Sequence, residues 1–395
     1  MNKVPNLRFS EFSEEWKSKK FKDIVWINQG LQIAISDRYL EDGENRFFYI
    51  TNEFLNKNSD KKYYIENPPS NVICKKTDIL MTRTGNTGRV ITGVSGAFHN
   101  NFFKINYDSK QHNQMFLYHV LTSFKVQKNI TRLAGTSTIP DLNHGDFYNI
   151  KISYPTLEEQ EKIASFFSLI DKKIELQTEK VEELKNYKKG IMQKIFSQEL
   201  RFKDENGNEY PELEEHTLGK LIKVKSIRNK DNKVELVLSV SNTKGFITQA
   251  EQFENRVVAS SDISNYKIVE KDDFAFNPAR INVGSIARLK THEKGIISPM
   301  YVCFNCLNLL DSSYFEYFLM THSFDVQMKK KLEGSVRQTL SAEALSEIKI
   351  KLPTLLEQKK IGEFLNKISA KIEKEEVKLV QLEKYKKGLL QQMFI

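Results

Sequence analysis

Two long stretches of the chain carry apolar residues at alternating spacings of four and three. The first set is Ile163, Phe167, Ile170, Ile174, Val181, Leu184, Ile191 and Ile195. The second set is Ile361, Leu365, Ile368, Ile372, Leu379, Leu382, Leu389 and Met393. A seam that recurs about every 3.5 residues is typical of coiled coils. The pattern therefore predicts two long helices, each roughly 50 to 60 Å in length.

Polar residues interrupt both seams at the same two points. Gln177 and Lys188 break the first seam, and Glu375 and Lys386 break the second. Matching defects in matching places favour helices that pack against each other. The alternative is a pair of unrelated amphipathic helices, each packed on its own domain.

The two helices belong to a longer repeat. Residues 150–196 and 348–394 align without a gap at an offset of 198, and about half of the aligned positions are identical. Each copy contains Ile-Lys-Ile, Pro-Thr-Leu, Glu-Gln, Tyr-Lys-Lys-Gly and a final Phe, in that order. The alternation in Ile-Lys-Ile predicts a short strand that ends at the proline. The chain is therefore internally duplicated.

Each predicted helix starts with the residues of a capping box. Thr156 is followed by Glu159, and Thr354 is followed by Glu357. In such a box each side chain bonds the backbone N–H of the other residue. We therefore expect the first turns of the two helices at these positions.

The segments before the repeats also resemble each other, more faintly. Leu7-Arg8-Phe9 matches Leu200-Arg201-Phe202, and Arg83 falls opposite Arg280. These segments are predicted to be β-rich with interspersed helices, for example Met115–Lys125 and Tyr314–Lys331. The fold class is therefore α+β, with two globular domains that alternate with two long helices. The expected boundaries are 1–152 for the first domain, 153–198 for its helix, 199–350 for the second domain and 351–395 for its helix.

Length and composition agree with a globular protein of two or three domains. The chain has 395 residues, of which 39% are hydrophobic and 28% charged, and this argues against disorder. Three cysteines suggest a reduced, intracellular protein. No apolar run approaches the roughly 18 residues of a membrane span, and the first residues form no signal segment. We therefore expect a cytoplasmic location.

The distribution of positive charge suggests where a polyanion would bind. The net charge is +9, and all 12 arginines lie in residues 1–150 or 200–347. An arginine fork can hold base edges or phosphates at two points, whereas lysine is a point charge. The alternative is that the long helices simply favour lysine and glutamate.

Two pairs of loops are candidates for DNA contacts, because arginine and asparagine can read base edges and glycine lets a backbone approach phosphate. The alternative is ordinary polar turns between strands. The candidates in the first domain are Arg83, Thr84, Asn86, Thr87 and Arg89, then Thr136, Ser137 and Thr138 after Gly135. Those in the second domain are Asn277, Arg280 and Asn282, then Ser335, Arg337 and Gln338 after Gly334.

Signals for catalysis or metal binding are weak. Asn67-Pro68-Pro69-Ser70 resembles the Asn-Pro-Pro-aromatic motif of amino-methyltransferases, but Ser70 stands where an aromatic must stack on the base. Cys303 and Cys306 have the spacing of half a zinc site without a second pair, so core thiols are expected. No Gly-x-x-x-x-Gly-Lys phosphate loop is present. We expect no catalytic residue, metal ligand or cofactor in this chain.

With these motifs in order, the whole chain resembles the DNA-specificity subunits of type I restriction-modification systems. The resemblance rests on the Leu-Arg-Phe openings, the Pro-Thr-Leu and Glu-Gln helix starts, and the Tyr-Lys-Lys-Gly endings before Phe196 and Phe394. One departure is Leu213, which stands roughly where the first opening has Trp16.

The resemblance implies a fold and a set of partners. In that family two target-recognition domains each read half of a bipartite, asymmetric DNA site. The helices form an antiparallel coiled coil that sets the gap between the half-sites and docks two methyltransferase subunits, which restriction subunits join. S-adenosylmethionine, ATP and Mg²⁺ would then belong to the partner subunits.

The Tyr-Lys-Lys-Gly segments are candidates for subunit docking. Gly190 and Gly388 lie inside helical pattern, where glycine costs about 1 kcal/mol relative to alanine. This repeated cost suggests close approach by the other helix or by a partner, although a frayed helix end would also explain it. The resemblance makes Tyr187, Lys188, Lys189, Tyr385, Lys386 and Lys387 the expected docking residues.

Two other functions stay open from sequence. One is a stand-alone regulatory protein with two DNA-binding domains, and the other is a free-standing DNA methyltransferase with unrecognised motifs. A stiff helical spacer favours the two-reader function, because it makes the second DNA contact intramolecular and fixes the gap. Such a frame favours half-sites about one helical turn, roughly 34 Å, apart.

Overall fold

A computed structural model describes residues 4–56, 59–135, 140–252, 262–334 and 338–395. The chain divides into two compact units. Unit 1 consists of Met1–Glu179 and Val377–Ile395, and unit 2 consists of Lys180–Glu376. Both boundaries between the units fall inside the long helices. Each unit is described below by itself.

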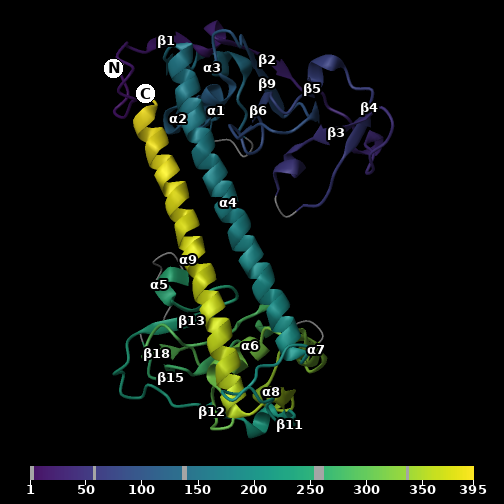
Figure 1. The fold of residues 1–395 in the computed structure, drawn as a ribbon, viewed down its shortest axis with the longest axis vertical. Helices are drawn as coiled ribbons and strands as arrows, with labels where there is room; N and C mark the ends of the chain where they lie inside the picture. Colours follow the sequence, from purple (N-terminus) through teal and green to yellow (C-terminus); the bar gives the residue numbers. More distant parts are fainter. Residues whose placement is uncertain (1–3, 57–58, 136–139, 253–261, 335–337) are drawn as a thin grey trace. The chain divides into compact units, whose positions relative to one another are not determined.

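The described residues of unit 1 form two four-stranded sheets and a two-stranded ribbon (Figure 1). The ribbon pairs β1 (Lys17–Lys20) with β10 (Lys151–Tyr154). The first sheet has the antiparallel order β2 (Val25–Gln29), β9 (Phe102–Tyr107), β6 (Ile79–Thr82) and β7 (Val90–Ile91). The second sheet has the order β4 (Tyr64–Glu66), β3 (Arg46–Ile50), β8 (Gly96–Phe98) and β5 (Ile73–Cys74), with β3 and β8 parallel.

Unit 2 repeats this topology strand for strand. Its ribbon pairs β11 (Glu214–Thr217) with β20 (Lys349–Leu352). Its first sheet has the order β12 (Ile222–Lys225), β19 (Val302–Cys306), β16 (Phe274–Phe276) and β17 (Ile286–Arg288). Its second sheet has the order β14 (Gly245–Thr248), β13 (Val237–Ser241), β18 (Lys294–Ile297) and β15 (Lys267–Glu270), again with a parallel central pair. The duplication predicted from the sequence is confirmed across the globular domains as well as the helices.

Short helices pack beside the sheets of each unit, and in unit 2 the helix Gln249–Gln252 lies against β13 and β14 of the second sheet. They are α1 (Gln114–Thr122), α2 (Phe124–Ala134) and α3 (His144–Asn149) in unit 1, and α5 (Gln249–Gln252), α6 (Ser312–Phe318), α7 (His322–Lys330) and α8 (Ala342–Ser346) in unit 2. The helices predicted at Met115–Lys125 and Tyr314–Lys331 are confirmed over most of both ranges, but each range contains a break between two helices. In unit 2 α6 ends at Phe318, and Thr321 caps the start of α7 by accepting the Phe324 N–H at 3.2 Å.

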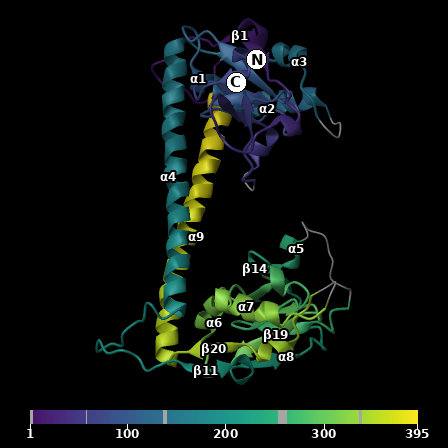
Figure 2. The same ribbon diagram turned by 90° about the vertical axis from the view of Figure 1, so that its right-hand side faces the viewer.

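The long helices are α4 (Leu157–Phe196) and α9 (Leu355–Met393), as the seams predicted. In unit 1 Phe167 of α4 lies near Phe394, just beyond α9, and Asp171 pairs with Lys386. The numbering therefore rises along one helix as it falls along the other. In unit 2 Lys180 pairs with Glu375 at 3.2 Å. Within each unit the two helix segments lie side by side and antiparallel (Figures 1 and 2).

The seam residues face the packed side of the helix pair. All sixteen apolar positions of the predicted seams are buried or half-buried. Two of the polar interruptions have charged partners in the same unit, Lys386 with Asp171 and Glu375 with Lys180. At these two positions the seam therefore has an ion pair in place of an apolar contact.

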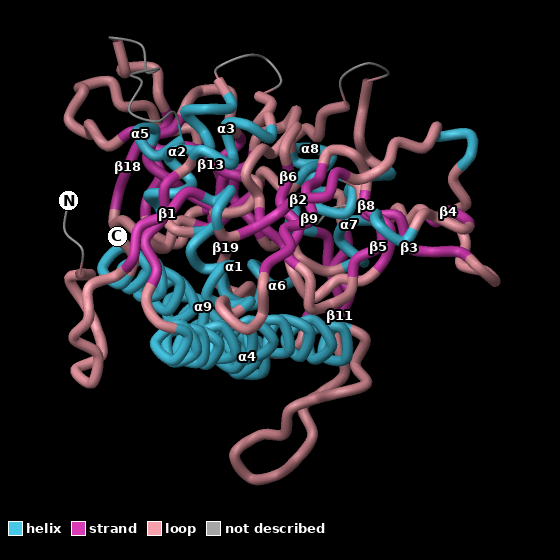
Figure 3. Tube along the Cα trace, turned by 90° about the horizontal axis from the view of Figure 1, so that it is seen from above, coloured by secondary structure: helices cyan, strands magenta, loops and turns pink. Residues whose placement is uncertain are grey.

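Each domain core is completed by the helix end of the other repeat. In unit 1 the core around β2, β9, β6 and α1 also contains Leu389, Met393 and Phe394. In unit 2 the equivalent core contains Ile195, with Phe196 packed against it. The strands of unit 1 lie to one side of α4, with α1 between them (Figure 3). The final Phe of each Tyr-Lys-Lys-Gly segment is thus a core residue.

The Leu-Arg-Phe and Glu-Gln motifs meet at the start of each long helix. Arg8 donates two hydrogen bonds to Glu159, at 2.8 and 2.7 Å, and Arg201 donates two to Glu357, at 3.2 and 2.7 Å. Both carboxylates are almost fully buried. The expected capping boxes are therefore wrong in one part, because the glutamates bind arginine instead of turning back to the threonines. None of the described helices is long and apolar enough to cross a membrane.

Candidate nucleic-acid interface

The two candidate loops of the first domain lie together. One loop, residues 82–89, connects β6 to β7, and the other follows Gly135. The Leu142 N–H donates to the Arg83 carbonyl at 3.0 Å, and the Thr87 hydroxyl donates to the Pro140 carbonyl at 2.7 Å. The structure thus brings together loops that are more than 45 residues apart in the sequence.

Arg83 and Thr84 bind an acidic side chain of the neighbouring loop. The Arg83 guanidinium donates to both oxygens of Asp141, at 3.0 and 2.7 Å, and the Thr84 hydroxyl donates to the same carboxylate. The arginine holds the pKa of Asp141 below its usual value. Arg83 therefore joins the two loops, and its fork is occupied in this structure.

The remaining candidates of this loop divide into turn formers and exposed side chains. Gly88 is needed because a Cβ there would lie 2.8 Å from Ile130 of α2, and its φ is +88°. This glycine serves packing inside the domain. Asn86 and Arg89 are exposed, and Arg89 also donates to the Leu55 carbonyl at 3.0 Å. Asn86 is therefore the polar side chain of this loop that is most available for a contact outside the protein.

The second domain joins its loops in the same way. The Leu340 N–H donates to the Pro278 carbonyl at 3.1 Å. Asn277 is buried, and its side-chain oxygen accepts the Ala279 N–H at 3.1 Å. Arg280 and Asn282 are exposed, and no described residue bonds or pairs with the Arg280 side chain. Asn277 thus shapes the turn, while Arg280 and Asn282 project from it.

Strand register corrects the alignment of Arg83 with Arg280. Ile79 pairs with Ile105, and Phe274 pairs with Phe304, in equivalent strand pairs. Ile79 and Phe274 are therefore equivalent positions. The fourth residue after each is Arg83 in the first domain and Pro278 in the second, so these two residues are equivalent as well. The same pairing follows from the two loop-joining hydrogen bonds. The domains therefore carry their exposed polar groups at different points of the same loop.

The second loop of each pair is only partly described. Thr136, Ser137 and Thr138 lie outside the described residues, as do Ser335 and Arg337. Gln338 is described and exposed. Gly135 and Gly334, which precede these segments, have φ values of +80° and +101°. Both loops thus begin with a residue in a backbone conformation that glycine adopts readily.

The six expected docking residues fall into two groups. Tyr187, Lys189, Tyr385 and Lys387 are exposed. Lys188 is half-buried, with its ammonium 5.0 Å from the centre of the Tyr317 ring, and Lys386 pairs with Asp171. These two lysines therefore make contacts within their own units.

The glycines of these segments are not required by close packing among the described residues. A Cβ at Gly190 or Gly388 would have no heavy atom within 4 Å, beyond the helix's own backbone. Close approach by the other long helix, one of the explanations expected from the sequence, is therefore wrong. The absence of such a neighbour concerns the described residues of this chain alone.

The possible zinc and methyltransferase motifs occupy ordinary structural positions. Cys303 and Cys306 lie three residues apart on β19, so their side chains point to opposite faces of the sheet. Burial raises the pKa of both thiols to about 12. Asn67 adopts a φ of +45° in a turn before a short 3-10 helix. Among the described residues no group of three or more His, Cys, Asp or Glu could hold a metal ion.

Sequence reasoning missed Asp141, and it missed the pairing of Glu159 and Glu357 with arginine. Asp141 holds the two loops of the first domain together, and Glu159 and Glu357 anchor the Leu-Arg-Phe openings. The arginine and the glutamate recur in both copies, and this shared occurrence could have suggested the ion pair. Nothing in the local pattern singles out Asp141, because its partner lies 58 residues away.

The comparisons with known proteins agree with this duplicated architecture. Residues 13–186 and 212–384 each match the family described as "Type I restriction modification DNA specificity domain". The type I restriction enzyme MjaVIII specificity subunit of Methanocaldococcus jannaschii is 26% identical over 407 residues, which cover 95% of this chain and 91% of that protein.

Two solved structures show the same fold. The crystal structure of a type I restriction-modification system S subunit from M. genitalium superposes with a TM-score of 0.60 at 18% identity, covering 99% of both chains. A chain from a study of complex assembly and conformational transition of the type I R-M system has a TM-score of 0.54 at 14% identity, covering 95% of this chain and 96% of that one. The chain therefore belongs to the type I restriction modification DNA specificity domain family, whose domain it contains twice.

Proposed function

We propose that this chain selects the DNA site of a type I restriction-modification complex. Each domain reads one half of a bipartite, asymmetric sequence through its paired loops, and the helix pair sets the gap between the halves. The observation that carries the proposal is the duplication of one topology with different exposed loop residues. Asn86 projects in the first domain, and Arg280 and Asn282 project in the second. Two unlike readers account for an asymmetric site.

The proposal assigns catalysis to other subunits. Two methyltransferase subunits dock on the chain, and restriction subunits join them. S-adenosylmethionine, Mg²⁺ and ATP bind to those partners. The docking surface includes the exposed Tyr187, Lys189, Tyr385 and Lys387. The chain itself supplies sequence selection and a scaffold, without catalytic residues.

A methylation assay tests this division of labour. The purified chain is incubated with DNA and labelled S-adenosylmethionine, with and without a methyltransferase subunit of a type I system. Label should enter DNA only when both proteins are present. Methylation by the chain alone would favour a free-standing methyltransferase. Failure to bind any such subunit would favour a stand-alone regulatory DNA-binding protein.

Single arginine substitutions test the assignment of one domain to each half-site. Arg83→Ala should relax specificity in one half-site and Arg280→Ala in the other, because each residue belongs to a different loop pair. Arg280, whose side chain no described residue binds, can make a bidentate contact with guanine that contributes about 1–3 kcal/mol of discrimination, whereas Arg83 acts by holding its two loops together through Asp141. Methylated-base mapping in cells that carry the intact system measures both effects. Relaxation of both half-sites by one substitution, or of neither by either, would contradict the proposal.

A further inference from the structure

The two units differ at one position that is central to the packing of each. β1 begins at Lys17, opposite Tyr154, and β11 begins at Glu214, opposite Leu352. Tyr154 and Leu352 are 198 residues apart, the offset of the repeat. The residues immediately before the two strands are therefore equivalent. They are Trp16 in unit 1 and Leu213 in unit 2.

In unit 1 the Trp16 indole fills the space between the strand ribbon and the long helices. Its side chain is only 3% exposed. The ring stands edge-on to Phe116 and Phe394, at centroid distances of 6.0 and 6.3 Å. The indole N–H donates to Glu159 at 3.2 Å. Trp16 thus has both an aromatic pocket and a buried carboxylate acceptor.

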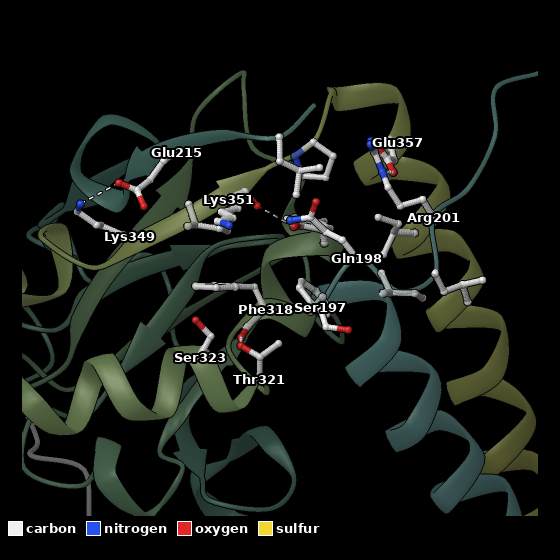
Figure 4. A pocket seen from close by; sticks show the side chains of 18 of the residues that line it. Ser197, Gln198, Arg201, Glu215, Phe318, Thr321, Ser323, Lys349, Lys351 and Glu357 are labelled. Carbon is white, nitrogen blue, oxygen red and sulfur yellow. Dashed lines mark hydrogen bonds and ion pairs between the residues drawn. The ribbon is translucent and has the colours of Figure 1, made fainter. Parts of the chain in front are cut away.

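In unit 2 the corresponding elements surround a cavity of about 420 Å³ (Figure 4). Its wall includes Leu213, Phe196, Tyr314, Phe318 and Glu357. Arg201 and Glu357 lie together beside the start of α9, with Phe318 across the cavity from them (Figure 4). Phe196 and Glu357 are the counterparts of Phe394 and Glu159. Leucine is too short to occupy the space that the indole fills in unit 1.

The Glu357 carboxylate, which lines the cavity, can accept a further hydrogen bond. In unit 1 one oxygen of Glu159 accepts both from Arg8, at 2.8 Å, and from the Trp16 indole. In unit 2 Arg201 donates to both oxygens of Glu357, and no second side chain of the described residues replaces the indole N–H. An ionised carboxylate has about four lone-pair sites. Glu357 can therefore accept another N–H from inside the cavity.

We propose that this cavity of unit 2 is a binding site for an aromatic ring that carries an N–H donor, with indole as its best fit. The ring packs against Phe196 and Phe318, and its N–H donates to Glu357. It comes either from a tryptophan side chain of a partner protein or from a free indole compound. The site distinguishes the two otherwise similar units, because Trp16 already fills its counterpart. The proposal is independent of which DNA sequence the chain reads.

Binding of 5-fluoroindole to the full-length chain, followed by fluorine NMR, tests the site directly. One ring should bind per chain, and unlabelled indole should displace it. The N-methylated analogue, 1-methylindole, should bind at least tenfold more weakly, because it cannot donate to Glu357. N-acetyltryptophanamide distinguishes the two sources. Tighter binding than indole indicates a side chain of a partner, and weaker binding indicates a free compound.

Two matched substitutions test the site from opposite directions, and a third serves as the control. Leu213→Trp should abolish binding and raise the unfolding temperature, because the new side chain fills the cavity. Trp16→Leu should open the equivalent space in unit 1 and bring the stoichiometry to two rings per chain. Trp26→Leu, at an exposed position, should change neither. Absence of fluoroindole binding to the wild-type chain, or unchanged binding to Leu213→Trp, overturns the proposal.

Discussion

At the scale of single residues, the side chains with the largest expected effect on stability are buried charged groups. Glu159 is 1% exposed and depends on Arg8 for its two strongest hydrogen bonds. A buried carboxylate that loses its partner keeps the cost of desolvation, whereas removal of both charges avoids that cost. The Arg8–Glu159 pair therefore stabilises the start of α4 only while both members are present.

This argument predicts the outcome of a double substitution. Arg8→Ala should destabilise unit 1 by about 3–5 kcal/mol, the usual loss when one partner of a buried ion pair is removed. Arg8→Ala with Glu159→Gln should recover part of the loss, because glutamine is neutral and can still accept the Trp16 N–H. Denaturant unfolding of the three proteins measures the difference. Equal midpoints for the single and double variants would contradict the prediction.

His119 makes the stability of unit 1 depend on pH. The ring is fully buried against Phe167, with its Nε2 atom 4.0 Å from Asp171. Burial, assisted by the nearby Lys386 cation, lowers the pKa of His119 to about 3. In the unfolded chain the His119 imidazole therefore becomes protonated below about pH 6.5, whereas in the folded chain it stays neutral. The contribution of His119 to the stability of unit 1 is therefore fully present above about pH 6.5 and is lost as the pH falls below that value.

Tyr317, whose hydroxyl lies 2.9 Å from Ser369 of α9, is the counterpart of His119 in unit 2, so the natural control is His119→Tyr. The wild-type chain should lose up to about 1.4 kcal/mol per pH unit below pH 6.5 through this residue. The variant should lack that part of the slope and be more stable than wild type at pH 5. Denaturant unfolding between pH 5 and pH 7.5 measures both proteins. Parallel pH profiles would show that His119 is not responsible.

At the scale of elements, each long helix contributes its last turn to a core built by the other repeat. Phe394 is 9% exposed and contacts Trp16, Phe116 and Phe167. Phe196 is half-buried and contacts Tyr314 and Phe318. The aromatic residue at the end of each helix is therefore a tertiary contact, although it lies far in sequence from the domain that it stabilises.

The two terminal phenylalanines should differ in their effect. Phe394→Ala should destabilise unit 1 by about 3–5 kcal/mol, the range for a buried phenylalanine in a packed core. Phe196→Ala should destabilise unit 2 by less, because that ring is more exposed and borders the cavity. Hydrogen exchange resolved along the chain assigns each loss to its unit. A larger loss in unit 2 would contradict this order.

The elements show which features can be predicted from a sequence. The seams of α4 and α9 were predictable, because periodic burial leaves a periodic pattern. The pairing of Arg83 with Asp141 was not, because it depends on two loops meeting in space. The alignment of Arg83 with Arg280 failed for a related reason, since residue identity in a diverged loop says less than strand register. The loop residues named as DNA contacts stay a prediction.

At the scale of the whole molecule, the two compact units are built differently. Unit 2 is one continuous segment, 180–376, and every member of its principal core lies within that segment. Unit 1 needs residues 1–179 together with 377–395. Leu389, Met393 and Phe394 each contribute about 2 kcal/mol of apolar burial to its core. Their sum is comparable with the total stability of an ordinary domain, about 5–15 kcal/mol.

Fragments of the chain should reflect this difference. Residues 180–376 expressed alone should unfold cooperatively on heating. Residues 1–179 alone should lack a cooperative transition and regain one when a peptide of residues 377–395 is added. Circular dichroism during a thermal scan measures all three samples. A cooperative transition of 1–179 without the peptide would show that the helix end is dispensable.

The discontinuous construction of unit 1 has a consequence for protein synthesis. Its globular part leaves the ribosome first, yet its core waits for a helix end that is translated about 200 residues later. At roughly 5–20 residues per second this delay lasts about 10–40 s. During that interval the nascent chain exposes apolar surface that chaperones can bind. The first domain to be made is thus the last to mature.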